Sequence, residues 1–272
     1  MHNFRGNSPL YSGAFEHNRF LRYNDAMFAL LKAVFYQPLY NGLIFLIAAL
    51  PGASVGFGVV LLTIFIKLLL FPLSQKAARF QMLMKEHEGE VSRLKERFKS
   101  DKQAQGKAIL DFYREKKINP FASILPIFIQ IPVVIALYYV FFNGGLPLVD
   151  ASLLYSFVSP PETMDMHFIG IDIAGKSLLL AILVGITQYF QGRLALPPPK
   201  PRSATPSLGE DLAHGMHLQM KYMMPVFMAF VSYAVSGAVA LYFITSNVFT
   251  IGQELYIRGK FTREKRIMPT KK

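Results

Sequence analysis

The sequence predicts an all-α membrane protein: a five-transmembrane-helix bundle with an N-terminal interfacial helix and a cytoplasmic helical hairpin. Hydrophobic residues make up 52% of the 272 residues, and about half of them lie in five long segments. Each segment approaches the roughly 20 apolar residues that a helix needs to cross a bilayer. Lysine and arginine are concentrated in alternate connections, and two amphipathic patterns fall between the first two segments. The absence of cysteine excludes disulfides, thiol catalysis and cysteine-based metal clusters.

The chain before the first long segment is only partly apolar. Residues 1–26 are polar and lack the order of a cleavable signal peptide, so we expect a surface arm there. Residues 27–55 are more apolar but are interrupted by Lys32, Gln37, Pro38 and Asn41. We therefore predict an interfacial amphipathic helix at 27–55 rather than a sixth span.

The remaining chain forms a five-span core, 56–256, followed by a basic cytoplasmic tail, 257–272. The predicted spans are 56–75, 121–142, 177–196, 220–235 and 237–256. The fourth is short, which favours a tilted helix or one continuous with its neighbour. Residues 196–211 are rich in proline and small polar residues, as in a flexible connection.

The basic residues predict the orientation of the spans. Residues 76–117 carry twelve lysines and arginines, whereas 143–175 carry none and contain Asp150, Glu162, Asp165 and Asp172. Cytoplasmic connections are the ones rich in lysine and arginine. The first connection and the tail are therefore predicted to be cytoplasmic, with the N-terminus outside and the C-terminus inside.

The first connection, 76–119, has the pattern of two helices. Val91, Leu94 and Phe98 recur at helical spacing, and so do Ile109, Phe112 and Tyr113. Between the two patterns, Ser100 and Gln103 have the spacing of a capping box. We predict a helical hairpin that projects into the cytosol; a solvated charged loop is the alternative.

The sequence lacks the motifs of common enzymes. It has no P-loop, no nucleophile elbow and no HExxH motif, so we expect neither catalysis nor a cofactor. His214 and His217 have a spacing that could bind a metal, but no third ligand lies near them in the sequence. They are better explained as surface histidines, and we expect no metal site.

Polar residues within four of the spans predict a shared site. Thr63, Lys67 and Ser74 fall on one face of the first span if its helix is continuous. The other three spans contribute the following polar residues: Gln130, then Gln188 and Gln191, then Tyr242, Ser246, Thr250 and Gln253. Such residues either line a hydrated cavity or join helices through hydrogen bonds of about 0.6–2 kcal/mol. For the uncharged residues both interpretations remain open.

Lys67 favours the hydrated cavity. A lysine at the centre of a span costs about 2.5–3.5 kcal/mol on insertion scales. No span offers a central carboxylate to pair with it, because Glu254 lies near the cytoplasmic end of the last span. Water and polar groups would stabilise the ammonium in a groove, which would then suit a negatively charged ligand. A dry, neutral lysine is the alternative.

One stretch carries a specific family resemblance. The segment NPFASILPIFIQIPVVIALYY, at 119–139, resembles the YidC family of membrane protein insertases, which includes the mitochondrial Oxa and chloroplast Albino proteins. The matching positions are Asn119, Pro120, Pro126, Gln130, Pro132, Ala136, Leu137, Tyr138 and Tyr139. Residues 67–77 resemble the family's first core span, and 224–253 resemble its last two.

The resemblance implies a groove that is open to the cytoplasm and to lipid but closed to the outside. In bacterial members a groove arginine attracts acidic residues of the client, and Lys67 occupies that position here. Lysine keeps the charge but loses the planar, bidentate guanidinium. The chain is similar to the short form of the family, without the large extracytoplasmic domain.

The function that the resemblance implies is that of an insertase and chaperone in the bacterial cytoplasmic membrane. It would move hydrophobic segments and short polar flanks of newly made membrane proteins through the groove without nucleotide hydrolysis. Basic residues of the hairpin are expected to contact the client or the ribosome: Arg79, Arg93, Lys95, Arg97, Lys99 and Lys102. The tail would contact ribosomal RNA or anionic lipid. Whether a Sec translocon works beside the protein stays open. The alternative function is a small-anion transporter or channel that uses Lys67 as its binding charge.

Overall fold

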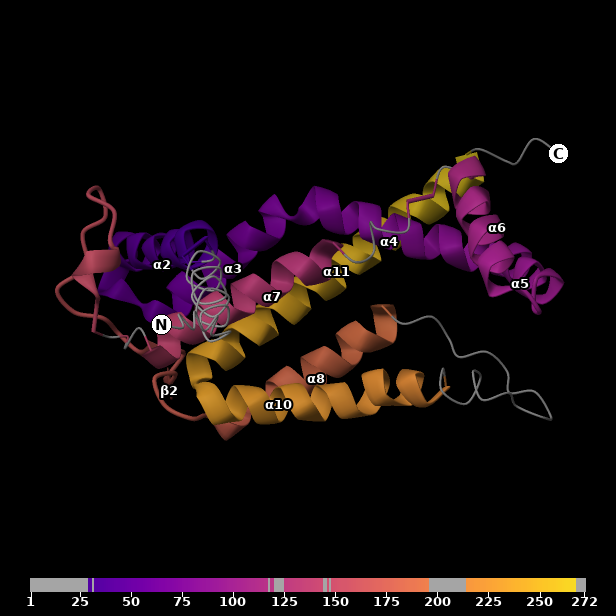
Figure 1. Ribbon diagram of the computed structural model, residues 1–272. Helices are drawn as coiled ribbons and strands as arrows, with labels where there is room; N and C mark the ends of the chain where they lie inside the picture. Colours follow the sequence, from indigo (N-terminus) through magenta and orange to yellow (C-terminus); the bar gives the residue numbers. More distant parts are fainter. Residues whose placement is uncertain are drawn as a thin grey trace, which may run out of the picture.

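The computed structural model describes residues 29–30, 32–116, 118–119, 125–143, 146, 148–195 and 214–267. The predicted arm, 1–26, and the predicted connection, 196–211, lie outside these residues, as do the last five residues of the tail. The described chain is mostly helical, as the sequence predicts, and it forms an elongated bundle (Figure 1).

The elements follow one another as helices joined by short breaks. Their order is η2 (Lys32–Tyr36), α2 (Gln37–Ala49), η3 (Pro51–Ala53), α3 (Val55–Leu69), α4 (Phe71–Glu86), α5 (Glu88–Arg97), α6 (Lys102–Glu115), α7 (Leu125–Tyr138), η5 (Tyr139–Asn143), η6 (Ala151–Leu153), β1 (His167–Phe168), β2 (Ile171–Asp172), α8 (Leu178–Ala195), η7 (Gln219–Met223), α10 (Met224–Val235) and α11 (Gly237–Ile267). The two short strands pair antiparallel. In the bundle, α11 packs against α3 and α8, and α8 also packs against α10.

The helix lengths bear on the number of membrane spans. Among the described helices, α8 is long and apolar enough to cross a membrane by itself. The bent pair α3 and α4 meets the same criterion only if the two helices are taken together. A shorter apolar helical stretch, Gln130–Phe141, covers the later part of α7 and the start of η5. The count of five spans therefore stays a prediction.

The predicted continuous helix over 56–75 is wrong, because it is broken at Leu70 between α3 and α4. The two helices meet at a bend of 60°. Pro72 stands in the first turn of α4, where its missing N–H costs nothing. Within a continuous helix, the same ring would clash with the carbonyl four residues earlier. Ser74 consequently lies on α4, beyond the bend, and not on the face of α3 that carries Thr63 and Lys67.

The last helix is longer than the predicted span. We expected it to end at residue 256, but α11 continues to Ile267, so the described part of the basic tail is helical. An ion pair between Arg258 Nε and Glu254 Oε1, 2.8 Å long and one helical turn apart, links this extension to the end of the predicted span. Ser236, in extended conformation, separates α11 from α10.

The apolar core lies around α2, the segment predicted to be interfacial. Tyr40, Leu43, Ile44 and Ile47 of α2 are fully buried. They pack with α3, where Gly58 permits a close approach: a Cβ there would lie 2.7 Å from Ile47 Cγ1. The position of α2 at the membrane interface stays a prediction, and the structure shows that its apolar face is covered by protein.

Asn41 joins α2 to the connection 143–175, the acidic loop, although in the sequence it is only an interruption of an apolar run. It is buried, and its Nδ2 donates to the Leu153 carbonyl at 2.8 Å. Its Oδ1 accepts from the Tyr155 N–H at 2.7 Å. Nearby, the Tyr40 hydroxyl accepts from the Asp150 N–H at 2.8 Å. The loop is thus held to α2 by buried polar contacts, which are costly to break.

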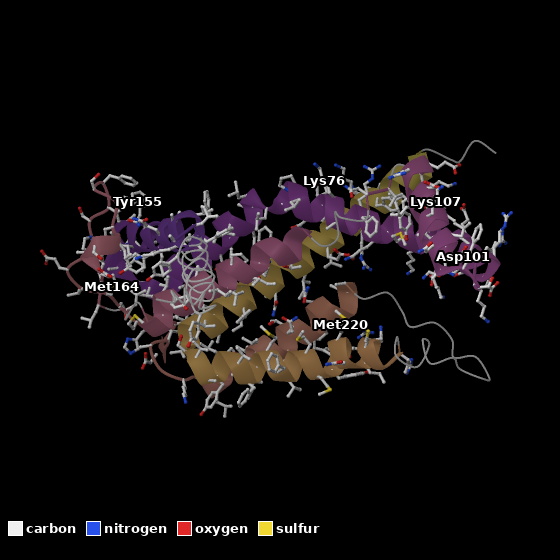
Figure 2. All side chains as sticks on the ribbon, viewed as in Figure 1. Lys76, Asp101, Lys107, Tyr155, Met164 and Met220 are labelled. Atoms are coloured by element: carbon white, nitrogen blue, oxygen red, sulfur yellow. The ribbon has the colours of Figure 1, made fainter. Side chains whose placement is uncertain are left out.

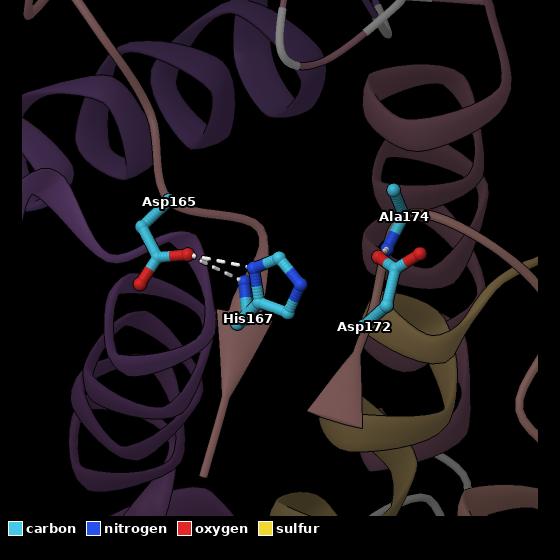
Figure 3. Close-up of polar contacts among 4 residues, drawn as sticks. All are labelled: Asp165, His167, Asp172 and Ala174. Carbon is cyan, nitrogen blue, oxygen red and sulfur yellow. Dashed lines mark hydrogen bonds and ion pairs between the residues drawn. The ribbon is translucent and has the colours of Figure 1, made fainter. Parts of the chain in front are cut away.

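The acidic loop also joins the beginnings of α3 and α11. The Val55 N–H donates to the Asp165 carbonyl, and the Gly237 and Ala238 N–H groups donate to the Gly175 and Ile173 carbonyls. Figure 3 shows the local turns: Asp165 Oδ1 accepts from the His167 N–H at 2.9 Å, and Asp172 Oδ1 accepts from the Ala174 N–H at 2.8 Å. The His167 backbone and imidazole hold the pKa of Asp165 below its usual value. The loop therefore closes one end of the bundle.

The opposite end carries α5 and α6, which pack against each other. Val91 and Phe112 are buried between them, and Gln105 Nε2 donates to the Lys95 carbonyl at 2.6 Å. The predicted capping residue, Ser100, is wrong by one position. Asp101 caps α6, because its carboxylate accepts from the Gln103 and Ala104 N–H groups at 2.9 and 3.0 Å. Figure 2 shows Asp101 and Lys107 far from Tyr155 and Met164, at opposite ends of the molecule.

Gly237→Ala is predicted to destabilise the fold because the new Cβ would lie 2.8 Å from the Ile173 Cα. Overpacking of this kind costs about 1–3 kcal/mol, or roughly 2–4 °C of Tm per kcal/mol. Thermal unfolding in detergent measures the effect. Gly252→Ala, on the same helix with nothing near its Cβ position, is the control and should not lower Tm. An equal Tm for the two variants would contradict the close approach.

Asp101→Ala is predicted to loosen the start of α6. Loss of a helix cap costs about 1 kcal/mol, which corresponds to about fivefold faster amide hydrogen exchange. The amides of Gln103 and Ala104 should change most, because they donate to Asp101. Asp111→Ala removes a carboxylate from the same helix that makes only an exposed ion pair, and it should leave those amides unchanged.

Candidate functional site

A polar stripe runs along α11. It consists of Tyr242, Ser246, Thr250 and Gln253, at the helical spacing seen in the sequence. Tyr242, Ser246 and Gln253 are buried, with Tyr242 only 3% exposed. Buried polar groups need hydrogen-bond partners. Neighbouring helices supply partners to this face of α11 at three points, of which two lie on the stripe.

The first point is Lys67, in the last turn of α3. Its Nζ donates to Thr250 Oγ1 at 3.2 Å, and the Thr250 hydroxyl donates in turn to the Ser246 carbonyl at 2.8 Å. Thr63, one turn earlier, is buried and donates to its own helix at the Val59 carbonyl. The structure thus brings Lys67 into contact with Thr250, one residue of the predicted stripe, whereas Thr63 bonds within its own helix.

The surroundings of Lys67 contain no acidic partner within the described part of the chain. No carboxylate there forms an ion pair with its half-buried ammonium. An ammonium has three donors, and Thr250 accepts from one. The remaining donors can bind water or an anionic group. The site can therefore stabilise a negative charge brought to it.

The second point joins α11 to α7. Gln130 Nε2 donates to the Tyr242 hydroxyl across the two helices. Gln130 is half-buried, as expected for a residue that fixes one helix against another. The hydrogen bond supports the interpretation of Gln130 as a residue that joins helices.

The third point joins α11 to α8 through residues that sequence reasoning missed. Asn247 is 6% exposed, and its Nδ2 donates to Thr187 Oγ1 at 3.2 Å. Asn247 lies beside the stripe, not on it, so spacing alone did not select it. A useful signal was the run of polar residues 187, 188 and 191 on α8, because α8 was expected to share the site.

The remaining predicted residues lie apart from Lys67. Gln188 Nε2 donates to Gln191 Oε1 at 3.1 Å within α8, and Ser74 donates to the Leu70 carbonyl beyond the bend. The described residues contain no group of three or more histidines, cysteines, aspartates or glutamates that could hold a metal ion. The arrangement is one of a single cation among neutral polar groups between helices.

The comparisons with known proteins identify the family of the chain. A family model described as 60Kd inner membrane protein matches residues 46–265. The chain is 30% identical over 205 residues to the membrane protein insertase YidC of Clostridium tetani, covering 75% of this chain and 82% of the relative. The YidC of Paraburkholderia phymatum is 30% identical over 215 residues, and that of Burkholderia vietnamiensis 31% over 207.

The two longer relatives are matched over only part of their length. The alignments cover 78% and 75% of this chain but 34% and 32% of those relatives, about a third of each. The protein is thus a helical member of an inner-membrane family. It belongs to the 60Kd inner membrane protein family, which is the YidC, Oxa and Alb family resembled by residues 119–139.

A double-mutant cycle on Gln130 and Tyr242 should reveal their coupling. We expect Gln130→Met and Tyr242→Phe to interact by about 0.6 kcal/mol, the average for hydrogen bonds within membranes. Unfolding in mixed micelles of increasing SDS content gives the free energies. The control pairs Gln130→Met with Tyr256→Phe, which changes another tyrosine of α11. The effects of these two substitutions should be additive. Additivity in the first cycle would mean that the hydrogen bond does not stabilise the bundle.

Proposed function

We propose that this protein is a membrane protein insertase and chaperone. Membership of the family supports the class, and the cation site at Lys67 is the observation that carries the mechanism. A short polar flank of a newly made client enters a hydrophilic groove beside Lys67, while the adjoining hydrophobic segment moves into lipid. The reaction makes and breaks no covalent bond, and nucleotide hydrolysis is not required.

Lys67 lowers the energy of an acidic flank in the membrane. An aspartate at the centre of a bilayer costs about 2.5–3.5 kcal/mol on insertion scales. A charge-assisted hydrogen bond contributes about 1.5–3 kcal/mol. One contact with the ammonium would therefore offset a large part of that cost. Thr250 holds the ammonium from the α11 side and leaves its other donors to the client.

The surfaces on either side of the site suit a hydrophobic segment. On α7, Ile131 and Ile135 are exposed, and on α10 so are Val226, Phe227 and Phe230. We propose that the client segment leaves along these two helices. Burial of its apolar surface, at about 25 cal/mol per Å², supplies the driving force. The acidic loop, held to α2, α3 and α11, supports a groove that is closed at that end.

The hairpin end is suited to capture. Arg93, Lys95, Arg97, Lys99 and Lys102 are all exposed on or between α5 and α6. Their charges can attract ribosomal RNA or an acidic client, and such attraction weakens with salt. We propose that this end lies in the cytoplasm and the acidic loop outside, in a bacterial inner membrane.

The test is complementation of cells depleted of their own insertase, with insertion of a short single-span client as readout. The client carries one aspartate in its translocated flank. Lys67→Ala should slow insertion roughly tenfold, the loss expected for one charge-assisted hydrogen bond, and Lys67→Glu should slow it further. Lys67→Arg should retain most activity, because it keeps the charge.

The controls separate the function from the role of the charge. Lys107→Ala removes an exposed lysine of α6 and should not change insertion. A client with asparagine in place of its aspartate should lose its dependence on Lys67. Failure of the wild type to complement would overturn the insertase proposal. Full activity of Lys67→Glu would overturn only the role of the charge.

A further inference from the structure

A cavity of about 330 Å³ lies between α4 and the C-terminal half of α11, away from Lys67. Three cations line it: Lys76 and Arg79 from α4, and Lys260 from α11. All three side chains are exposed, and none forms an ion pair with a carboxylate of the described residues. Like charges that converge without a counter-charge repel one another, so the cavity favours an anion.

Most of the remaining lining is apolar. Ile257 is buried, and Met82 and Phe261 are half-buried around the same cavity. A small inorganic anion would gain nothing from these side chains. An anionic group attached to an apolar body would use both parts of the lining, because apolar burial adds to the charge interaction.

The position along the helices points to the membrane surface. Leu68 and Leu69 are exposed at the end of α3, and the apolar run continues through the bend only as far as Leu73, three residues before Lys76. The Phe71 and Tyr256 rings, 6.1 Å apart, lie beside the cavity on the side of these leucines. Aromatic rings such as tyrosine gather at the level of lipid headgroups, and lysine and arginine lie just beyond.

We propose that this cavity binds the phosphate-bearing headgroup of an anionic phospholipid. Arg79 offers a planar fork of donors for phosphate oxygens, and the two lysines add compact charges. Gln75 supplies a neutral amide at the cavity. A bound headgroup would join α4, which leads into the hairpin, to α11, which carries the polar stripe. This site is separate from the client site and goes beyond the proposed function.

The absence of tryptophan from the chain permits a local measurement. Phe261→Trp places one fluorophore at the cavity, and brominated lipids quench it on contact. In phosphatidylcholine vesicles, brominated phosphatidylglycerol should compete for the site about fivefold better than brominated phosphatidylcholine, as expected when a headgroup meets basic side chains. In the variant that combines Phe261→Trp with Arg79→Gln and Lys260→Gln, the preference for phosphatidylglycerol over phosphatidylcholine should be lost.

The matched control removes the same charges elsewhere. Arg93→Gln with Lys95→Gln takes one arginine and one lysine from α5 and should leave the preference intact. Retention of the preference in the cavity variant, or its loss in the control, would overturn the proposal. Tyr256→Trp, beside the cavity, gives a second reporter if Phe261→Trp disturbs the fold.

A further arm distinguishes the lipid from a soluble phosphate. Millimolar inorganic phosphate is compared with chloride at equal ionic strength, so that screening is the same in both samples. Phosphate should not displace the lipid, because it has no apolar body to contact the apolar part of the lining. Loss of the lipid preference only in phosphate would assign the cavity to a soluble phosphate compound and overturn the lipid headgroup as its ligand.

Discussion

The polar face of α11 is the constraint on which the rest of the bundle depends. Lys67 on α3 and Gln130 on α7 bond to its stripe, and Thr187 on α8 bonds to Asn247 beside it. The hydrophobic effect does not drive one helix against another in lipid, because lipid tails are as apolar as leucine, so close packing and interhelical hydrogen bonds hold the helices together. Hydrogen bonds from three neighbouring helices fix the rotation of α11 about its own axis. The same bonds fix the positions of those three helices against α11.

The two ends of the molecule are built differently. At the loop end, backbone groups of 165–175 bond to the beginnings of α3 and α11, and Asn41 holds the loop to α2. At the other end, α5 and α6 pack mainly on each other around Val91 and Phe112. The first end has many buried polar contacts that resist opening. The second has a small core of its own, formed between α5 and α6.

The sequence predicted the helical class and much of the polar stripe, because periodicity and apolar runs are local signals. It also placed Lys67 and Thr250 in one predicted site, and their side chains are joined by a hydrogen bond in the structure. The break at Leu70 was missed because apolar residues continue through it, although Pro72 was a visible signal. Asn41 and Asn247 were missed for another reason. Their partners, Leu153 and Thr187, are distant in sequence, and no pattern along one helix reveals such contacts.

The bend at Leu70 also explains how Lys67 is tolerated without a carboxylate. In a continuous helix the lysine would lie at mid-length, far from either end. Because α3 stops at Leu69, Lys67 stands in its last turn, where the helix dipole has its negative end. That negative end stabilises a cation by about 0.3–1 kcal/mol and adds to the bond with Thr250. The backbone of α3 thus supplies part of the counter-charge, while no carboxylate in the described part of the chain forms an ion pair with the ammonium.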